Sequence, residues 1–219
     1  MLATNYLRAW IALLLAVGTA VSSQEKPASP PMVPGEVIVK FTTKSQGAEL
    51  VARAAAKGAL PDAELNKHVQ SLAKKVEIPL AVKQLGSGGN VILTVEQTDL
   101  LVTLAQKLKA RPNVEQANVT PLGGETVQAI EVRFVPGSLE ANALAQIRIS
   151  GYDLRSIIVP LERDYSLKLN GQISNAGFLL LKLDLNALTI DLSRRLAEQP
   201  DVEYAQPNFV RRIIGRTKS

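Results

Sequence analysis

Short runs of β-branched and aliphatic residues alternate along this chain with longer stretches in which leucine recurs at every fourth position. The short runs are typical of β-strands, and the fourfold spacing places apolar side chains on one face of a helix. The predicted strands are residues 36–41, 91–95, 114–119, 129–135, 178–183 and 202–205. Two further strands are less sharply defined, one within residues 78–85 and one within residues 154–169.

The pattern contains an internal repeat. Leu100, Leu104, Leu108, Pro112, Val114, Glu115 and Ala117 recur 88 positions later as Leu188, Leu192, Leu196, Pro200, Val202, Glu203 and Ala205. Each leucine set lines one face of a helix, and each proline stops that helix because it cannot continue the hydrogen-bond ladder. Further upstream the offset is 93, which pairs residues 39–41 with residues 132–134. One structural unit is therefore used twice.

Each copy has the order β, α, β, β, α, β, which is the split βαβ plan. We therefore predict an α+β protein with two ferredoxin-like domains, residues 35–120 and residues 126–210. Each domain would be a four-stranded antiparallel sheet with two helices on one face. The opposite face of each sheet would be left open, and an open face is covered by water or by a partner.

The chain on either side of these domains has a different composition. Arg8 followed by an apolar run at residues 10–17 predicts a signal peptide over residues 1–23, and that run is too short to span a bilayer. An uncleaved anchor is the alternative. Residues 24–34 hold four prolines and predict a linker, and residues 211–219 form a basic tail. We expect a secreted or periplasmic protein with no stable membrane insertion after cleavage.

Composition narrows the chemistry. The chain has no cysteine, one histidine (His68) and 4% aromatic residues. A thiolate nucleophile or thiolate metal site is excluded, a Ser-His-Asp arrangement would depend on His68 alone, and stacking on single-stranded nucleic acid lacks a platform. Residues 86–89 are glycine-rich but lack the lysine of a phosphate loop, and they predict a hairpin turn. We expect no enzymatic activity, no cofactor, no metal and no nucleic-acid partner.

The end of the second copy carries a family resemblance. Residues 198–210, which read Glu-Gln-Pro-Asp-Val-Glu-Tyr-Ala-Gln-Pro-Asn-Phe-Val, resemble the closing segment of the propeptides of subtilisin-type serine proteases. Residues 34–41 resemble the start of the N-terminal prodomain of fervidolysin-like subtilases. The resemblance covers residues 34–210, but the chain departs from the family because no catalytic domain follows residue 210.

The resemblance implies a binder of a subtilisin-like serine protease, either an inhibitor or a folding helper. Family propeptides pack the open sheet face on the protease and lay an extended C-terminal strand in its cleft. The implied protease-binding tail is Tyr204, Ala205, Gln206, Pro207, Asn208, Phe209 and Val210. Glu162 and Asp164, near the loop between the second and third strands of the second copy, would cap helices of the protease. The second copy would therefore be the docking copy.

Two other interpretations stay open. In the first of these, the chain is an orphaned prodomain without a current role. In the second, it is a two-domain ferredoxin-like binding or sensory module for a small ligand or a protein. The sequence leaves the oligomeric state undetermined. Inhibition of a protease would favour the protease binder, and stabilisation by a small ligand would favour the binding or sensory module. Observing neither result would favour the orphaned prodomain.

Overall fold

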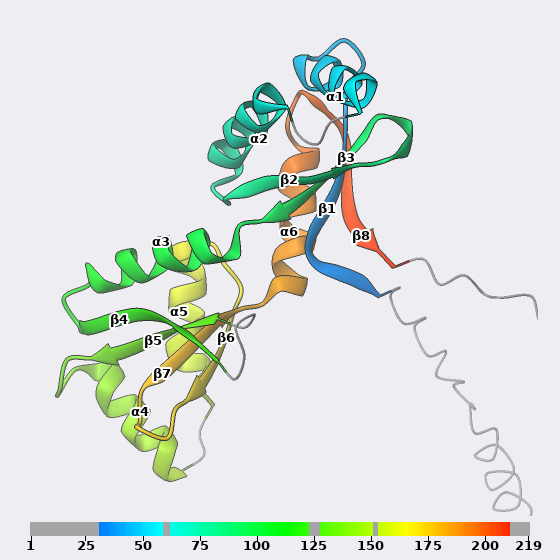
Figure 1. Cartoon of the computed structure of the whole chain (residues 1–219). Coiled ribbons are helices and arrows are strands. Elements are labelled where there is room, and N and C mark those ends of the chain that lie inside the picture. Colours follow the sequence, from blue (N-terminus) through cyan, green and yellow to red (C-terminus); the bar gives the residue numbers. More distant parts are fainter. Residues whose placement is uncertain (1–30, 59–61, 123–127, 151–152, 211–219) are drawn as a thin grey trace, which may run out of the picture. The chain divides into compact units, whose positions relative to one another are not determined.

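The computed structural model describes residues 31–58, 62–122, 128–150 and 153–210 (Figure 1). The described residues belong to one unit. Its elements follow in the order β1 (Met32–Phe41), α1 (Gln46–Lys57), α2 (Ala63–Val76), β2 (Leu80–Leu85), a short 3-10 turn η1 (Ser87–Gly89), β3 (Asn90–Val95), α3 (Gln97–Lys109), β4 (Val114–Pro121), β5 (Gln128–Phe134), α4 (Leu139–Ser150), α5 (Arg155–Tyr165), β6 (Leu169–Ile173), β7 (Leu179–Leu183), α6 (Leu185–Ala197) and β8 (Val202–Phe209).

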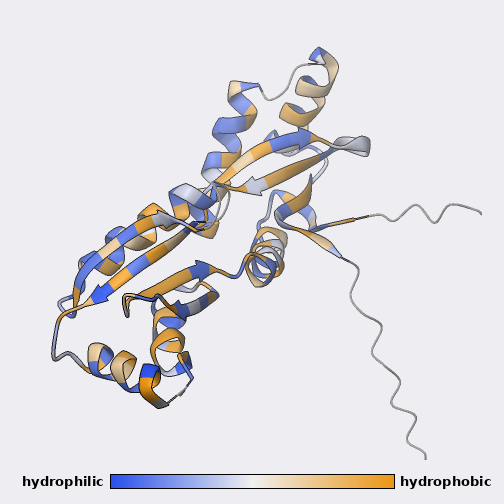
Figure 2. Ribbon diagram, turned by 60° about the horizontal axis from the view of Figure 1, so that its bottom comes forward, coloured by the Kyte–Doolittle hydropathy of each residue, from blue (hydrophilic) through white to orange (hydrophobic). Residues whose placement is uncertain are grey.

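The elements form where the sequence pattern places apolar side chains on one side. In β1, Val37, Val39 and Phe41 are fully or almost fully buried, and the residues between them are less so. Leucines of α3 and α6 at fourfold spacing lie in the core, and Figure 2 shows apolar residues recurring along these elements. Asp184 caps α6, because its side chain accepts a hydrogen bond from the backbone N–H of Ala187 at 3.0 Å.

The strands form two antiparallel sheets of four strands each. Sheet A has the order β2-β3-β1-β8, and sheet B has the order β4-β5-β7-β6. Both orders are those of a ferredoxin-like sheet, in which the first strand lies between the third and the fourth. The predicted α+β class with two ferredoxin-like sheets is confirmed.

The two copies of the repeat exchange their fourth strands, which the sequence pattern did not predict. Strand β8 ends the second copy but pairs with β1 of the first, with Val39 opposite Ala205 and Ile38 opposite Gln206. Strand β4 ends the first copy but pairs with β5 of the second, with Asn118 opposite Glu131. The helix before each exchanged strand goes with it, since α6 packs on β1 and β8 and α3 packs on β4 and β5.

The exchange changes how the chain is divided between the sheets. The continuous segment from α3 to β7 supplies all four strands of sheet B, and the segments before and after it supply sheet A. The chain passes between these two parts at Glu96 and at Asp184, which are equivalent positions of the repeat. Neither copy of the repeat contributes all the strands of one sheet.

Several boundaries differ from the sequence predictions. The second strand of the second copy is predicted within residues 154–169, but residues 155–165 form helix α5. The strand itself is β6, which follows that helix. The first helical stretch of each copy is two helices, and β8 continues four residues beyond the predicted strand. The end of the predicted linker, residues 32–34, belongs to β1. The predicted signal peptide, most of the linker and the basic tail lie outside the described residues.

Across the described parts of the chain, no helix combines the length and the apolar character needed to cross a membrane.

Candidate functional site

The segment that carries the family resemblance forms an edge of sheet A. Residues Tyr204 to Phe209 lie within β8 and are paired with β1, and the backbone N–H of Val210 donates to the carbonyl oxygen of Pro31 at 2.8 Å. The predicted protease-binding tail, which is Tyr204, Ala205, Gln206, Pro207, Asn208, Phe209 and Val210, is thus an edge strand of sheet A together with the residue after it, and its binding role stays a prediction. On one side, the backbone of β8 is hydrogen-bonded to β1 of the first copy. The other side of β8 is an edge of sheet A, with no neighbouring strand among the described residues.

Alternate residues of these strands define the face of sheet A that points away from the core. Because Val37, Val39 and Phe41 point into the core, Glu36, Ile38 and Lys40 point to the other side. Residues directly opposite each other in neighbouring strands share a face. We call this surface the outer face of sheet A, and its residues include Glu36, Ile38, Lys40, Asn90, Ile92, Tyr204, Gln206 and Asn208.

The outer face of sheet A has an apolar centre and a polar surround. Ile38 and Ile92 lie opposite each other in β1 and β3, at the middle of the sheet. Around them, the Tyr204 hydroxyl donates to Oδ1 of Asn90 at 2.8 Å, and Nζ of Lys40 lies 6.0 Å from the centre of the Tyr204 ring. An apolar centre with a polar rim is the general pattern of protein-binding surfaces.

Glu36 links three strands on this face. Its carboxylate accepts hydrogen bonds from Nζ of Lys83 in β2 and from Nδ2 of Asn208 in β8, the latter at 2.8 Å. The side chain of Glu36 is only 8% exposed, so both partners are needed to satisfy a charge that is largely removed from water. At the edge of the sheet, Lys40 forms an ion pair with Glu203 at 2.8 Å. These contacts hold the side chains of this face in defined positions.

The two acids predicted to cap helices of a protease lie elsewhere. Glu162 and Asp164 are in helix α5, before β6, and not in the loop between β6 and β7. Glu162 accepts a hydrogen bond from the backbone N–H of Leu169 at 3.0 Å, and Asp164 pairs with Arg111 at 3.0 Å. The two acids therefore do not lie near that loop, because the local sequence continues a helix through them, and their role as caps of protease helices stays a prediction.

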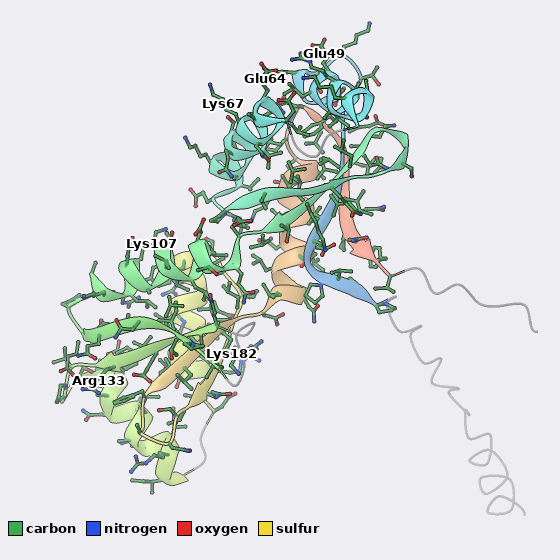
Figure 3. All side chains as sticks on the ribbon, in the orientation of Figure 1. Glu49, Glu64, Lys67, Lys107, Arg133 and Lys182 are labelled. Carbon is green, nitrogen blue, oxygen red and sulfur yellow. The ribbon has the colours of Figure 1, made fainter. Side chains whose placement is uncertain are left out.

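The corresponding face of sheet B carries charged side chains as well as Leu180, which lies opposite Glu131 of β5. Figure 3 labels Arg133 of β5 and Lys182 of β7 on this sheet. The guanidinium carbon of Arg133 lies 4.3 Å from the centre of the Phe178 ring, and Nζ of Lys182 lies 3.3 Å from Oε1 of Gln172. The two sheets therefore offer faces of the same kind but with different side chains.

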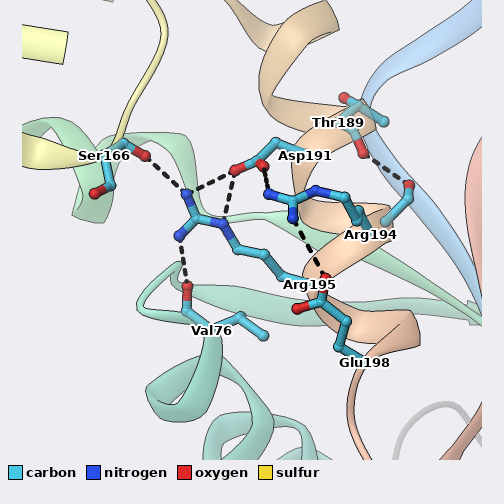
Figure 4. Close-up of polar contacts among 8 residues, drawn as sticks. Val76, Ser166, Thr189, Asp191, Arg194, Arg195 and Glu198 are labelled. Atoms are coloured by element: carbon cyan, nitrogen blue, oxygen red, sulfur yellow. Dashed lines mark hydrogen bonds and ion pairs between the residues drawn. The ribbon is translucent and has the colours of Figure 1, made fainter. Parts of the chain in front are cut away.

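A second cluster of polar groups surrounds Arg195 of α6 (Figure 4). Its Nη2 atom donates to the carbonyl oxygen of Ser166 at 2.9 Å, its Nη1 atom to that of Val76 at 3.3 Å, and its Nε atom to Oδ2 of Asp191 at 2.7 Å. Val76 is the last residue of α2, and Ser166 caps the end of α5. One cation thus meets the negative ends of two helices.

Asp191 is held ionised by its neighbours. Burial of Asp191 opposes its charged form, but hydrogen bonds from Arg194 and Arg195 outweigh this and lower the pKa of Asp191 below its usual 3.8. Close to this cluster, the buried hydroxyl of Thr189 accepts from the backbone N–H of Gly35 at 2.7 Å and donates to the carbonyl oxygen of Leu185 at 2.5 Å. This bond ties α6 to β1, elements of different copies.

His68 has no arrangement typical of a catalytic base. Its ring packs edge-on against Phe41 at 5.3 Å, and its Nε2 atom is buried with no hydrogen-bond partner. Burial lowers the pKa of His68 below 6.5, and the charge of Lys75 acts in the same direction against the opposing charge of Asp201. Within the described parts of the chain, no three His, Asp or Glu side chains lie together in a way that could hold a metal ion.

Comparison with known proteins adds nothing to this description: no protein-family model, curated protein or solved structure matches the chain.

Sequence reasoning missed the cluster around Arg195. The dibasic pair of Arg194 and Arg195 was visible in the sequence, but the partners of Arg195 are backbone carbonyls that no sequence pattern marks. The exchange of strands had a visible signal. Only a few residues separate β4 from β5, and strands joined by a short connection usually pair as a hairpin.

Proposed function

We propose that this protein is a non-enzymatic binder of a subtilisin-like serine protease that restrains the protease by docking through the outer face of sheet A. The observation that carries the proposal is the location of the segment that resembles the propeptide ending. That segment is β8, and it brings Tyr204, Gln206 and Asn208 to the outer face of sheet A.

The chemistry of this face supports a protein partner. Ile38 and Ile92 supply an apolar centre, and the pairs around them leave few side chains to be ordered on binding. Fixing side chains before association reduces the entropy lost when two proteins meet. The free edge of β8 adjoins the face, so that a partner strand has backbone groups to pair with next to it.

The way of docking differs from the one that the family resemblance implies. Residues 204–209 are paired with β1 in sheet A, so they would meet a protease as the edge strand of a sheet and not as a separate arm. The proposal therefore rests on the sheet face and not on an extended arm. The docking surface also combines both copies, since β1 and β3 belong to the first copy and β8 to the second.

Substitution at equivalent positions of the two sheets tests the proposal. Gln206 in β8 and Asn118 in β4 are equivalent in the repeat, 88 residues apart, and both side chains are exposed. Gln206→Arg places a bulky charge on the outer face of sheet A, and Asn118→Arg makes the matching change on sheet B. The measurement is the rate at which a subtilisin-type protease hydrolyses a chromogenic peptide in the presence of each purified protein.

We expect the unchanged protein to slow hydrolysis, Gln206→Arg to weaken this inhibition about tenfold or more, and Asn118→Arg to leave it unchanged. Digestion of the protein without any slowing of the protease would contradict the proposal. A loss of inhibition in Asn118→Arg alone would move docking to sheet B and would show that the outer face of sheet A is not the site.

A further inference from the structure

A cavity of about 270 Å³ lies beside the Arg195 cluster, where the ends of α2 and α5 meet α3 and α6. Its apolar lining includes Ile78, Leu100, Leu104 and Leu167. Ile78 and Leu167 follow directly after the two helix caps Glu77 and Ser166, both of which have left-handed backbone conformations. Equivalent parts of both copies therefore build one cavity.

The polar rim of the cavity is not equivalent in the two copies. Lys107 of α3, labelled in Figure 3, corresponds to Arg195 of α6, and Thr103 corresponds to Asp191, each 88 residues earlier. In α6 the cation is paired with the acid one turn before it. In α3 a threonine occupies the position of that acid, and both Thr103 and Lys107 line the cavity.

Lys107 is consequently a cation without the carboxylate that its counterpart has. Among the residues that the structure describes, none forms a hydrogen bond or ion pair with the side chain of Lys107, and the same holds for the side chain of Lys74, which also lines the cavity. Glu77 is the acid on the rim, so the two lysines leave an excess of positive charge beside an apolar lining. A ligand that complements this cavity has an anionic group on an apolar body.

We propose that the cavity binds a small organic carboxylate. Its carboxylate lies against Lys107 and Thr103, taking the place that Asp191 has beside Arg195, and its apolar part lies on Ile78, Leu104 and Leu167. This site is separate from the outer face of sheet A, and the inference does not depend on the proposed protease binding.

Titration of the whole protein with hexanoate tests the inference, with amide chemical shifts of the isotopically labelled protein as the measurement. We expect saturable shifts concentrated in residues 100–107 and 165–167. Hexanamide has the same shape without the charge and is expected to bind about tenfold more weakly. Shifts of equal size and affinity with both compounds would overturn the inference, as would shifts spread evenly over the surface.

Three substitutions and one control test the assigned roles. Lys107→Gln should weaken hexanoate binding about tenfold, and Lys109→Gln, which removes the same charge two residues away and outside the cavity, should not. Glu77→Gln should tighten binding because it removes the acid from the rim. Thr103→Asp restores the acid found in α6 and should abolish binding while the protein stays folded. Binding of hexanoate by Thr103→Asp as tight as by the unchanged protein would show that the carboxylate does not lie there.

Discussion

The guanidinium of Arg195 donates to the carbonyl oxygen of Ser166 at 2.9 Å, although Arg195 lies in a helix of sheet A and Ser166 caps a helix that precedes a strand of sheet B. The same guanidinium reaches Val76 at the end of α2. A single side chain therefore joins a helix of the part that forms sheet A to a helix of the part that forms sheet B. It does so through backbone carbonyl groups, which any residue at positions 76 and 166 would supply.

Removing this side chain should destabilise the protein. Arg195→Ala leaves two helix-terminal carbonyls without this donor and leaves Asp191 with Arg194 alone, and we expect the free energy of unfolding to fall by about 1–3 kcal/mol. Arg194→Ala removes a neighbouring arginine whose ion pairs are exposed, and it should cost less than about 1 kcal/mol. Urea denaturation of both variants measures the difference. Equal losses would show that the contacts of Arg195 add nothing beyond a surface ion pair.

The hydroxyl of Thr189 should matter more than its volume. Thr189→Val keeps the shape of the side chain but leaves the buried N–H of Gly35 unpaired, which should reduce stability by about 1–3 kcal/mol. Thr189→Ser keeps the hydroxyl and serves as the control. Thermal or urea unfolding of the pair distinguishes the hydrogen bond from packing, because a packing effect would make the serine variant the weaker one.

Cutting the chain between the copies should not separate them. A specific protease site introduced at residues 123–127 allows cleavage between β4 and β5. Because β4 pairs with β5 and β8 pairs with β1, we expect the two fragments to elute together in gel filtration and to part only in denaturant. Fragments that elute separately under native conditions would mean that each copy completes its own sheet.

The stability of the protein should fall as the pH drops below 6.5. The pKa of His68 is lower in the folded protein, so the unfolded chain takes up a proton at a higher pH than the folded one. The contribution of His68 is present above pH 6.5 and is lost as the pH falls from there through the folded pKa. His68→Leu removes this group and should flatten the dependence between pH 7 and pH 5. Parallel curves for the two proteins would show that His68 does not titrate with folding.

The sequence predicted most strands and the second helix of each copy, but it did not predict helix α5 or the pairing of the strands. The fourfold leucines predicted α3 and α6, and the prolines after them marked where they end. The pattern of residues 114–119 and 202–205 predicted strands but carries no information on their neighbours, since both copies present a first strand with similar apolar side chains. The choice between the two first strands depends on long-range packing and on the connection between β4 and β5.

The candidate sites divide in the same way. The resemblance of residues 198–210 directed attention to β8, but only the pairing with β1 showed that the segment belongs to a sheet formed with the other copy. The loop near Glu162 and Asp164 was predicted at the wrong place because the second strand of this copy is β6, which follows helix α5. Arg195 and the cavity beside it depend on backbone atoms brought together from distant parts of the chain, which local patterns do not encode.

The exchange of β4 and β8 between the two copies has an evolutionary consequence. If an ancestral gene gave rise to both copies by duplication, losing one copy afterwards would remove strands from both sheets at once. Selection would then retain the pair together, and a change in one copy would be constrained by the partners it meets in the other.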